Sequence, residues 1–167
     1  VRKLYDNIVS YLSSLFSSGS MTEEQATQTA GMMYILSDIE RTDALCTEAT
    51  ESLQSILEKK HKLSPEAVED LCRGLQIIED MYQNVLEVIR TGNGEDARKI
   101  VHKKDNVLDL TLKLRKNHMK RVKQGACDAE MTSDFTRILH SFDRIGNSCA
   151  NIADAALTGV SFESVLK

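Results

Sequence analysis

The apolar residues between positions 68 and 89 recur at alternating spacings of three and four, the repeat of one face of an α-helix. They are Val68, Leu71, Leu75, Ile78, Tyr82, Val85 and Ile89. The only proline in the chain, Pro65, follows Ser64, and a Ser-Pro pair is typical of a helix start. The pattern therefore predicts a long helix from about Ser64 to Thr91, where two glycines interrupt it at positions 92 and 94.

The same rules predict four further helices, at about residues 2–17, 22–60, 95–123 and 128–159. Thr22 and Gln25 form a capping box, Gly125 ends the fourth helix, and Asp128 is expected to cap the fifth. The expected inward faces are Leu4, Ile8, Tyr11, Leu12 and Leu15; Met32, Leu36, Ile39, Cys46, Ala49 and Leu53; and Met131, Phe135, Ile138, Phe142, Ile145, Cys149 and Ile152. The predicted fold is all-α, an antiparallel bundle of about five long helices.

The composition argues against several classes of protein. A net charge of −4 argues against a general nucleic-acid binder, which is usually strongly basic. No apolar run approaches the roughly 18 residues of a membrane-spanning helix, so no transmembrane segment is expected in this chain. The cysteines lack metal-ligand spacing, and reduced, structural thiols in a cytosolic compartment are expected. They are Cys46, Cys72, Cys127 and Cys149, of which all but Cys127 fall on apolar faces.

The chain contains a weak internal repeat. A shift of 103 residues, from Ile35 to Ile138, aligns the second helix with the fifth and the first with the fourth. The third helix has no counterpart after Val1, so the chain resembles a truncated two-helix repeat, residues 1–61, followed by a complete three-helix repeat, residues 62–167. Because the chain also starts without Met, we expect it to be a piece of a longer protein.

Two segments at matching positions of the repeat carry a recognisable motif. They are Ser37-Asp-Ile-Glu-Arg-Thr-Asp-Ala-Leu-Cys46 and Ser141-Phe-Asp-Arg-Ile-Gly-Asn-Ser-Cys-Ala-Asn-Ile-Ala-Asp154. The second closely resembles the PhoU family motif, in which an acid precedes Arg-Ile-Gly and the helix continues to Asn-Ile-Ala-acid. That family has two tandem three-helix bundles with the motif in the last helix of each.

The resemblance implies a regulator of phosphate transport. A PhoU-like module also forms the cytosolic C-terminal region of bacterial sodium–phosphate cotransporters, and the incomplete first repeat fits that setting. The expected function is therefore a regulatory domain, not an enzyme, that modulates phosphate uptake. The expected partner is the transmembrane transporter domain of the same chain, at the cytoplasmic face of the bacterial inner membrane. The alternative is a free-standing regulator acting on a separate transporter and sensor kinase.

The resemblance also suggests a metal site, because several PhoU-like proteins bind metal through paired acids four residues apart. Such pairs share one helix face and can converge on a cation. The candidate ligands, for iron, zinc, nickel or manganese, are Glu40, Asp43, Asp105, Asp109, Asp143 and Asn147. The pattern departs from the family at Asn147, an amide in place of an acid, and at Ala44, four residues after Glu40. The competing interpretation is that these acids form surface ion pairs with Arg41, Arg144 and lysines.

Other signals favour structural roles. Glu58 and His61 have the spacing of di-iron bundles, but a second such pair is missing. His118 and His140 beside apolar faces are interpreted as partly buried structural histidines. A basic cluster near the end of the fourth helix suits the helix dipole, with a contact to the transporter or to anionic lipid as the alternative. It comprises Lys113, Arg115, Lys116, Lys120, Arg121 and Lys123.

Two rival functions remain, a metal-dependent enzyme and a purely structural bundle. The enzyme would use Glu40, Asp105, Asp109 and Asp143. The enzyme is disfavoured because no nucleophile or general base can be assigned. The truncated repeat makes a further prediction, since its first two helices carry apolar faces that a third helix would cover. We therefore expect either a homodimer through these two helices or their packing against the second repeat.

Overall fold

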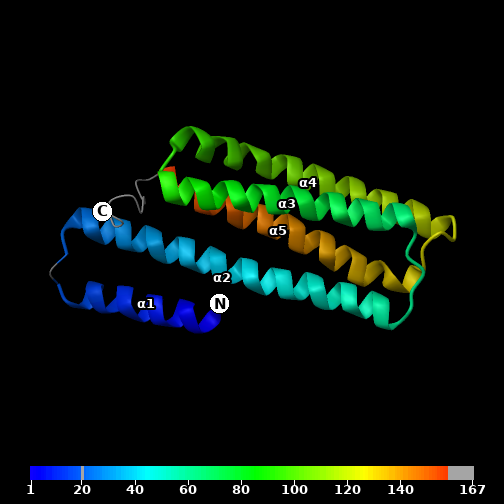
Figure 1. Ribbon diagram of the computed structural model, residues 1–167, viewed down its shortest axis with the longest axis horizontal. Coiled ribbons are helices and arrows are strands. Elements are labelled where there is room, and N and C mark those ends of the chain that lie inside the picture. The colour runs from blue at the N-terminus through cyan, green and yellow to red at the C-terminus, as the bar shows by residue number, and fades with distance from the viewer. Residues whose placement is uncertain (20, 158–167) are drawn as a thin grey trace.

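The computed structural model describes residues 1–19 and 21–157, which form five α-helices and one short 3-10 helix (Figure 1). Their bounds are α1 Arg2–Ser17, α2 Glu23–Glu58, α3 Pro65–Thr91, α4 Gly94–Lys123, the 3-10 helix η1 Ala129–Met131 and α5 Thr132–Leu157. The described residues contain no strand, and the expected all-α bundle is confirmed. The predicted end of the fifth helix near Gly159 lies outside the described residues.

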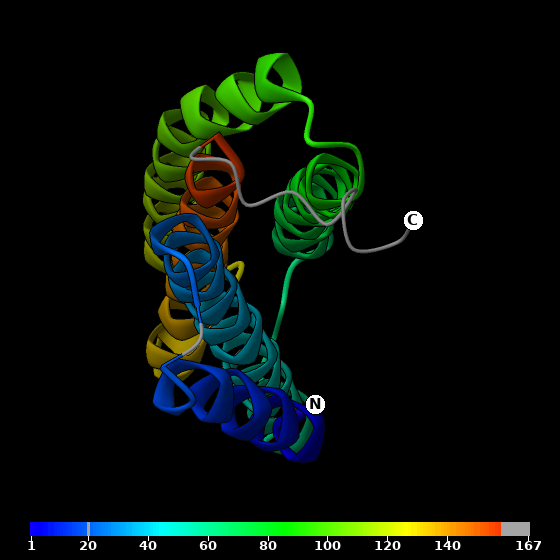
Figure 2. The same ribbon diagram turned by 90° about the vertical axis from the view of Figure 1, so that its left-hand side faces the viewer.

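The arrangement places α5 at the centre of the bundle. It packs against α2, α3 and α4, whereas α1 folds back along the first half of α2 (Figures 1 and 2). More than half of α5 is buried, including Phe135, Leu139 and Cys149, which are fully enclosed. A helix that is apolar on most sides belongs in a core, and this accounts for its position.

Local capping signals fix the starts of α2 and α3 as the sequence predicts. The Thr22 hydroxyl accepts a hydrogen bond from the Gln25 backbone N–H at 3.2 Å, and the Gln25 side-chain oxygen accepts one from the Thr22 N–H at 2.9 Å. The Ser64 hydroxyl accepts from the Ala67 N–H at 3.2 Å, with Pro65 at the first helical position. Both arrangements satisfy backbone donors that a helix start would otherwise leave without partners.

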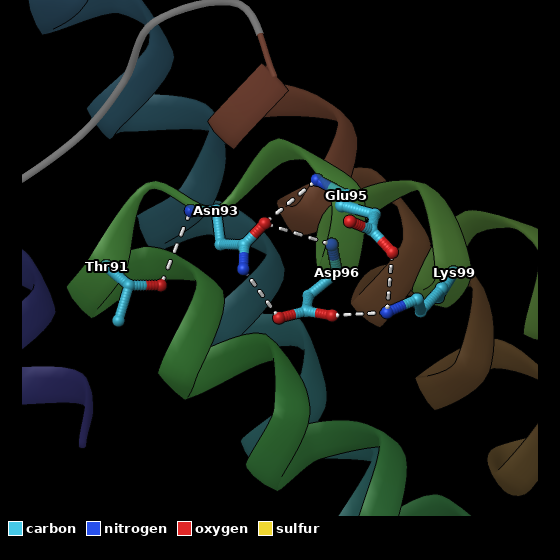
Figure 3. A network of polar contacts seen from close by, with 5 residues as sticks. All are labelled: Thr91, Asn93, Glu95, Asp96 and Lys99. Atoms are coloured by element: carbon cyan, nitrogen blue, oxygen red, sulfur yellow. Dashed lines mark hydrogen bonds and ion pairs between the residues drawn. The ribbon is translucent and has the colours of Figure 1, made fainter.

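The turn between α3 and α4 contains a cap that the sequence analysis did not identify. Gly92 ends α3 with a left-handed φ of +67°, a conformation that glycine adopts without a steric cost. Asn93 then accepts hydrogen bonds from the backbone N–H groups of Glu95 and Asp96, at 3.0 and 3.4 Å (Figure 3). Lys99 bridges both carboxylates, at 3.2 and 2.8 Å. Acids at a helix start also interact favourably with its dipole.

Asp128 does not cap α5, so that prediction is wrong. It precedes η1 and makes no side-chain capping hydrogen bond. Instead its carboxylate accepts a hydrogen bond from the Lys62 backbone N–H at 2.6 Å. Because Lys62 lies in the α2–α3 connection, Asp128 joins two loops at one end of the bundle rather than serving its own helix. The predicted end of α4 is confirmed, with Gly125 at a φ of +67°.

The predicted inward faces of α1 and α2 are partly wrong. Leu4 and Tyr11 are exposed, because α1 packs mainly on α2 and so has one covered side. In α2 the buried residues are Thr29, Ile35, Thr42, Leu45, Ser52 and Ile56, which lie beside the predicted face rather than on it. Cys46 and Leu53 of the predicted face are exposed. In α3 the neighbouring Cys72 is also exposed, whereas Cys127 and Cys149 are buried.

The contacts of α2 bear on the expected repeat. Helix α2 packs along α5, so it leans onto the second repeat, which was one of the two expected ways of covering its apolar face. Helix α1 does not. The division of the chain at residue 61, the internal repeat and the homodimer stay predictions.

The close approach of α3 to α5 yields a test of this packing. A Cβ atom at Gly74 would lie 2.7 Å from Cε2 of Phe142, a contact that forces the buried ring to move. Overpacking costs about 1–3 kcal/mol, and alanine offsets about 1 kcal/mol by its better helix propensity. We expect Gly74→Ala to lower the free energy of unfolding by about 1 kcal/mol in urea titrations followed by circular dichroism.

The matched control is Gly146→Ala. There the Cβ would meet Val107 at 3.1 Å, a milder approach, so the loss should be smaller. Adding Phe142→Leu to Gly74→Ala should lessen the effect of the alanine. An alanine at position 74 that stabilises the protein would contradict the close packing of α3 on α5.

Candidate functional site

The motif segment 141–154 lies in the middle of α5, and its residues divide by burial. The apolar members Ile145, Cys149 and Ile152 are buried. Gly146 is also buried and lets α4 approach closely, because a Cβ atom there would lie 3.1 Å from Val107. Asp143, together with Arg144 and Asn147, is only half-buried. Much of the motif therefore serves helix packing, and its polar members are the part accessible to a ligand or partner.

The predicted metal ligands come from three helices. Glu40 on α2 is half-buried, whereas Asp43 on α2 and Asp105 and Asp109 on α4 are exposed. On α5 the amide of Asn147 donates a hydrogen bond to the backbone carbonyl of Asp143 at 2.9 Å. The amide is therefore engaged with its own helix, one turn back.

The structure does not gather these acids into one centre. Among residues 1–19 and 21–157, no three His, Cys, Asp or Glu side chains lie where they could share a metal ion. Metal binding by these residues stays a prediction. The competing interpretation also lacks direct support, because Arg41 lies 4.0 Å from Asp38 instead of pairing with Glu40. The two residues with the di-iron spacing have other partners. The Glu58 carboxylate accepts a hydrogen bond from the Gln54 amide at 2.6 Å, and His61 Nδ1 lies 3.6 Å from the Asp128 carboxylate.

A buried ion pair joins α3 to α4, and the sequence analysis did not identify it. Arg121 Nη1 donates to Asp70 Oδ2 at 2.7 Å, and the Asn117 amide donates to the same oxygen at 3.4 Å. The side chains of Asp70 and Arg121 are only 9% and 11% exposed. Arg121 belongs to the basic cluster near the end of α4, whose other five members are exposed. Aspartate on a helix is usually exposed, so the sequence gave no sign that Asp70 would be buried.

His118 lies next to this ion pair and is fully buried. Its ring stacks on Phe135 with centroids 4.1 Å apart, and its Nε2 lies 3.2 Å from the Thr132 hydroxyl. Burial lowers the pKa of His118, and the positive charge of Arg121 lowers it further. The prediction of a structural histidine is confirmed for His118, whereas His140 is exposed.

Neither the buried Cys149 nor the exposed Cys46 is an activated thiol. Burial raises the pKa of Cys149 to about 12, with a smaller contribution from the Asp38 charge. Burial also raises the pKa of Cys46, assisted by Asp43. Because the thiolate is the reactive form, the raised pKa values make both thiols less reactive near neutral pH than an ordinary cysteine.

Comparison with known families identifies the class of protein. The PhoU domain family matches residues 71–156, from the first turns of α3 to the last turn of α5, which is just over half of the chain. The chain belongs to this family, and the resemblance expected from the motif in α5 is confirmed at that level. A comparison with curated proteins gave no match. No helix among the described residues is long and apolar enough to cross a membrane.

The buried ion pair predicts a large effect of one substitution. Removing one member leaves an uncompensated buried charge, which typically costs about 3–5 kcal/mol. We expect Asp70→Ala to lower the free energy of unfolding by about 3 kcal/mol in urea titrations. The double variant Asp70→Leu/Arg121→Met should recover most of this loss because it removes both charges.

Glu87→Ala is the control for the ion pair. It removes the partner of Arg90 in an exposed pair on the same helix, which water and salt screen, so its effect should be much smaller. Equal losses for Asp70→Ala and Glu87→Ala would show that burial does not govern the Asp70–Arg121 interaction.

The lowered pKa of His118 predicts a pH dependence. The unfolded chain protonates this histidine near its ordinary pKa of 6.5, whereas the folded protein takes up the proton only at lower pH. Stability is therefore complete above pH 6.5 and is lost as the pH falls below it towards the folded pKa. We expect His118→Phe, which preserves the stack on Phe135, to flatten the fall in melting temperature below pH 6.5, whereas exposed His140→Gln should not. An unchanged fall in His118→Phe would assign it to another group.

Proposed function

We propose that this chain is the regulatory PhoU domain of a sodium-dependent phosphate cotransporter and acts through protein contacts. Membership of the PhoU family carries the coarser part, a role in regulating phosphate transport. The finer part rests on the resemblance to the cytosolic modules of such cotransporters. The partner is then the transmembrane transporter domain of the same protein, at the cytoplasmic face of the bacterial inner membrane.

Contact rather than catalysis is the mode of action that the described residues support. The buried Asp70–Arg121 pair joins two helices, and the buried thiol of Cys149 remains protonated. The exposed surface, in contrast, carries a strong charge asymmetry. Helix α4 has ten basic and four acidic residues, whereas α2 has one basic and eight acidic. Such a distribution favours oriented association with a partner.

The basic end of α4 is the proposed contact with the transporter. Lys113, Lys116 and Lys120 are exposed, and none of them takes part in the buried Asp70–Arg121 ion pair. They lie on the same helix as Arg121, which is bound to Asp70 of α3, but their side chains are exposed. The proposal therefore separates a structural basic residue from binding residues within one cluster.

The test measures uptake of radiolabelled phosphate by the cotransporter with and without this domain, in cells grown in ample and in scarce phosphate. Removing the domain should change the dependence of uptake on phosphate supply by at least about fivefold, the lower end of usual allosteric couplings. Lys113→Glu/Lys116→Glu/Lys120→Glu should reproduce the removal, whereas Lys3→Glu on α1 should not. Unchanged uptake after removal of the domain would contradict the proposal.

The same assay separates the alternative, a free-standing regulator. A domain supplied as a separate polypeptide should not restore regulation if it must be tethered to its transporter. Full restoration at ordinary expression levels, together with a change in the output of a sensor kinase, would favour the free-standing protein.

A further inference from the structure

An apolar groove runs between α2 and α3, with α5 as its floor. One section, of about 420 Å³, is lined by Leu53 and Leu57 from α2, Val68 and Leu75 from α3, and Ile138 and Phe142 from α5. It continues into a second section of about 520 Å³, since both share Cys46, Leu75, Ile78 and Ile145. Val1, at the start of α1, lies in the lining of the second section. The two sections therefore form one continuous surface along the bundle.

Both walls of this groove expose large apolar side chains at helical spacing. Leu53 and Leu57 lie one turn apart on α2 and are 38% and 63% exposed, and Val68 and Leu75 lie two turns apart on α3 at 43% and 55%. Single exposed apolar residues are common, but a continuous set on two facing helices marks a binding surface. Leu53 of the predicted α2 face and Val68 and Leu75 of the predicted α3 face therefore line the groove instead of the core.

The charged side chains that line the groove are of one sign. Among the described residues, only Asp43 and Glu79 contribute charged side chains to its lining, one from each wall. The wall helices are also acidic as a whole, since α3 has six acidic and two basic residues in addition to the excess on α2. An occupant with a basic polar side would therefore be attracted, and an acidic one repelled.

We propose that this groove binds an amphipathic α-helix whose apolar side fills the floor and whose polar side is rich in Lys and Arg. A helix satisfies its own backbone hydrogen bonds, as it must when α2 and α3 offer no free strand edge for pairing. Its apolar residues recur every three or four positions, and the exposed Leu53 and Leu57 on the α2 wall are likewise four positions apart. The inference concerns a surface distinct from the basic end of α4 and does not depend on the proposed transport function.

A second copy of this chain fits the groove less well. In a two-fold dimer through this surface, the same patch would meet itself. Both grooves would then contribute only the acidic side chains Asp43 and Glu79 and no basic one, so a dimer would lack the charge complementarity that a basic helix offers. The charges thus distinguish a basic helix from a symmetric dimer.

The test uses two model peptides of about 18 residues, or five helical turns, with identical leucine positions. One carries lysine and the other glutamate on the polar side, and a scrambled Leu/Lys peptide controls for non-specific attraction. Dissociation constants for the 167-residue chain are measured by fluorescence anisotropy. We expect the Leu/Lys helix to bind at least about 10-fold more tightly than the Leu/Glu helix and the scrambled peptide, about 1.4 kcal/mol.

Variants locate the binding site. Leu57→Gln/Leu75→Gln changes two exposed groove residues and should weaken binding of the Leu/Lys helix about 10-fold. Leu112→Gln, on α4 and 50% exposed, is the matched control and should leave binding unchanged. Asp43→Asn/Glu79→Gln should weaken binding of the Leu/Lys helix and strengthen that of the Leu/Glu helix. Circular dichroism establishes that each variant is folded.

Several results would overturn the proposal. Equal binding of the Leu/Lys and Leu/Glu helices would remove the charge argument, and this comparison needs only the wild-type chain. Binding that the groove variants do not weaken would place the peptide elsewhere. A dimer that Leu57→Gln/Leu75→Gln dissociates in sedimentation, without peptide binding, would make a second copy the occupant. Peptide binding that requires removal of residues 158–167 would assign the groove to that segment.

Discussion

The packing of α5 against three other helices is the constraint on which the rest of this structure depends. A helix buried on most of its sides must bring its neighbours close, and the chain achieves this with Gly74 on α3 facing Phe142 and Gly146 on α5 facing Val107. These contacts fix the positions of α3 and α4. The same helix carries the PhoU motif, whose apolar members, among them Phe142, Ile145 and Cys149, belong to the core. Interiors packed at this density transmit small changes in one helix to its neighbours.

A second constraint is polar. The Asp70–Arg121 pair and the stacked His118 are buried at the end of the bundle where α3 begins and α4 ends. Arg121 Nε and Nη2 and His118 Nδ1 are buried without a hydrogen-bond partner in the structure. Such a cluster contributes less to stability than an apolar core of equal volume. Its effect is directional, because only one register of α3 on α4 lets the two charges meet.

The sequence predicted helix ends better than helix faces, for a physical reason. Ends depend on residues within one turn, such as Thr22 with Gln25 or Ser64 before Pro65, and these interactions are local. Faces depend on which helices meet, and the periodicity of α2 does not say that Ile35 rather than Leu36 would lie deepest. The burial of Asp70 could not be predicted, because its partner Arg121 is 51 residues away in the sequence. Of the candidate site, the motif in α5 was recognised, but the sequence could not say that no three of the candidate acids would lie where they could share a metal ion.

The two faces of the molecule impose different requirements on its partners. Helix α4 presents lysines to solvent at one side, whereas α2 and α3 enclose an apolar groove bordered by Asp43 and Glu79. A single partner with one charge sign cannot suit both surfaces, because attraction at one implies repulsion at the other. A bundle with two such surfaces can therefore hold two different partners at once. Since both surfaces border helices that pack on α5, a change in packing at one could alter binding at the other, which is the physical basis of coupling between sites.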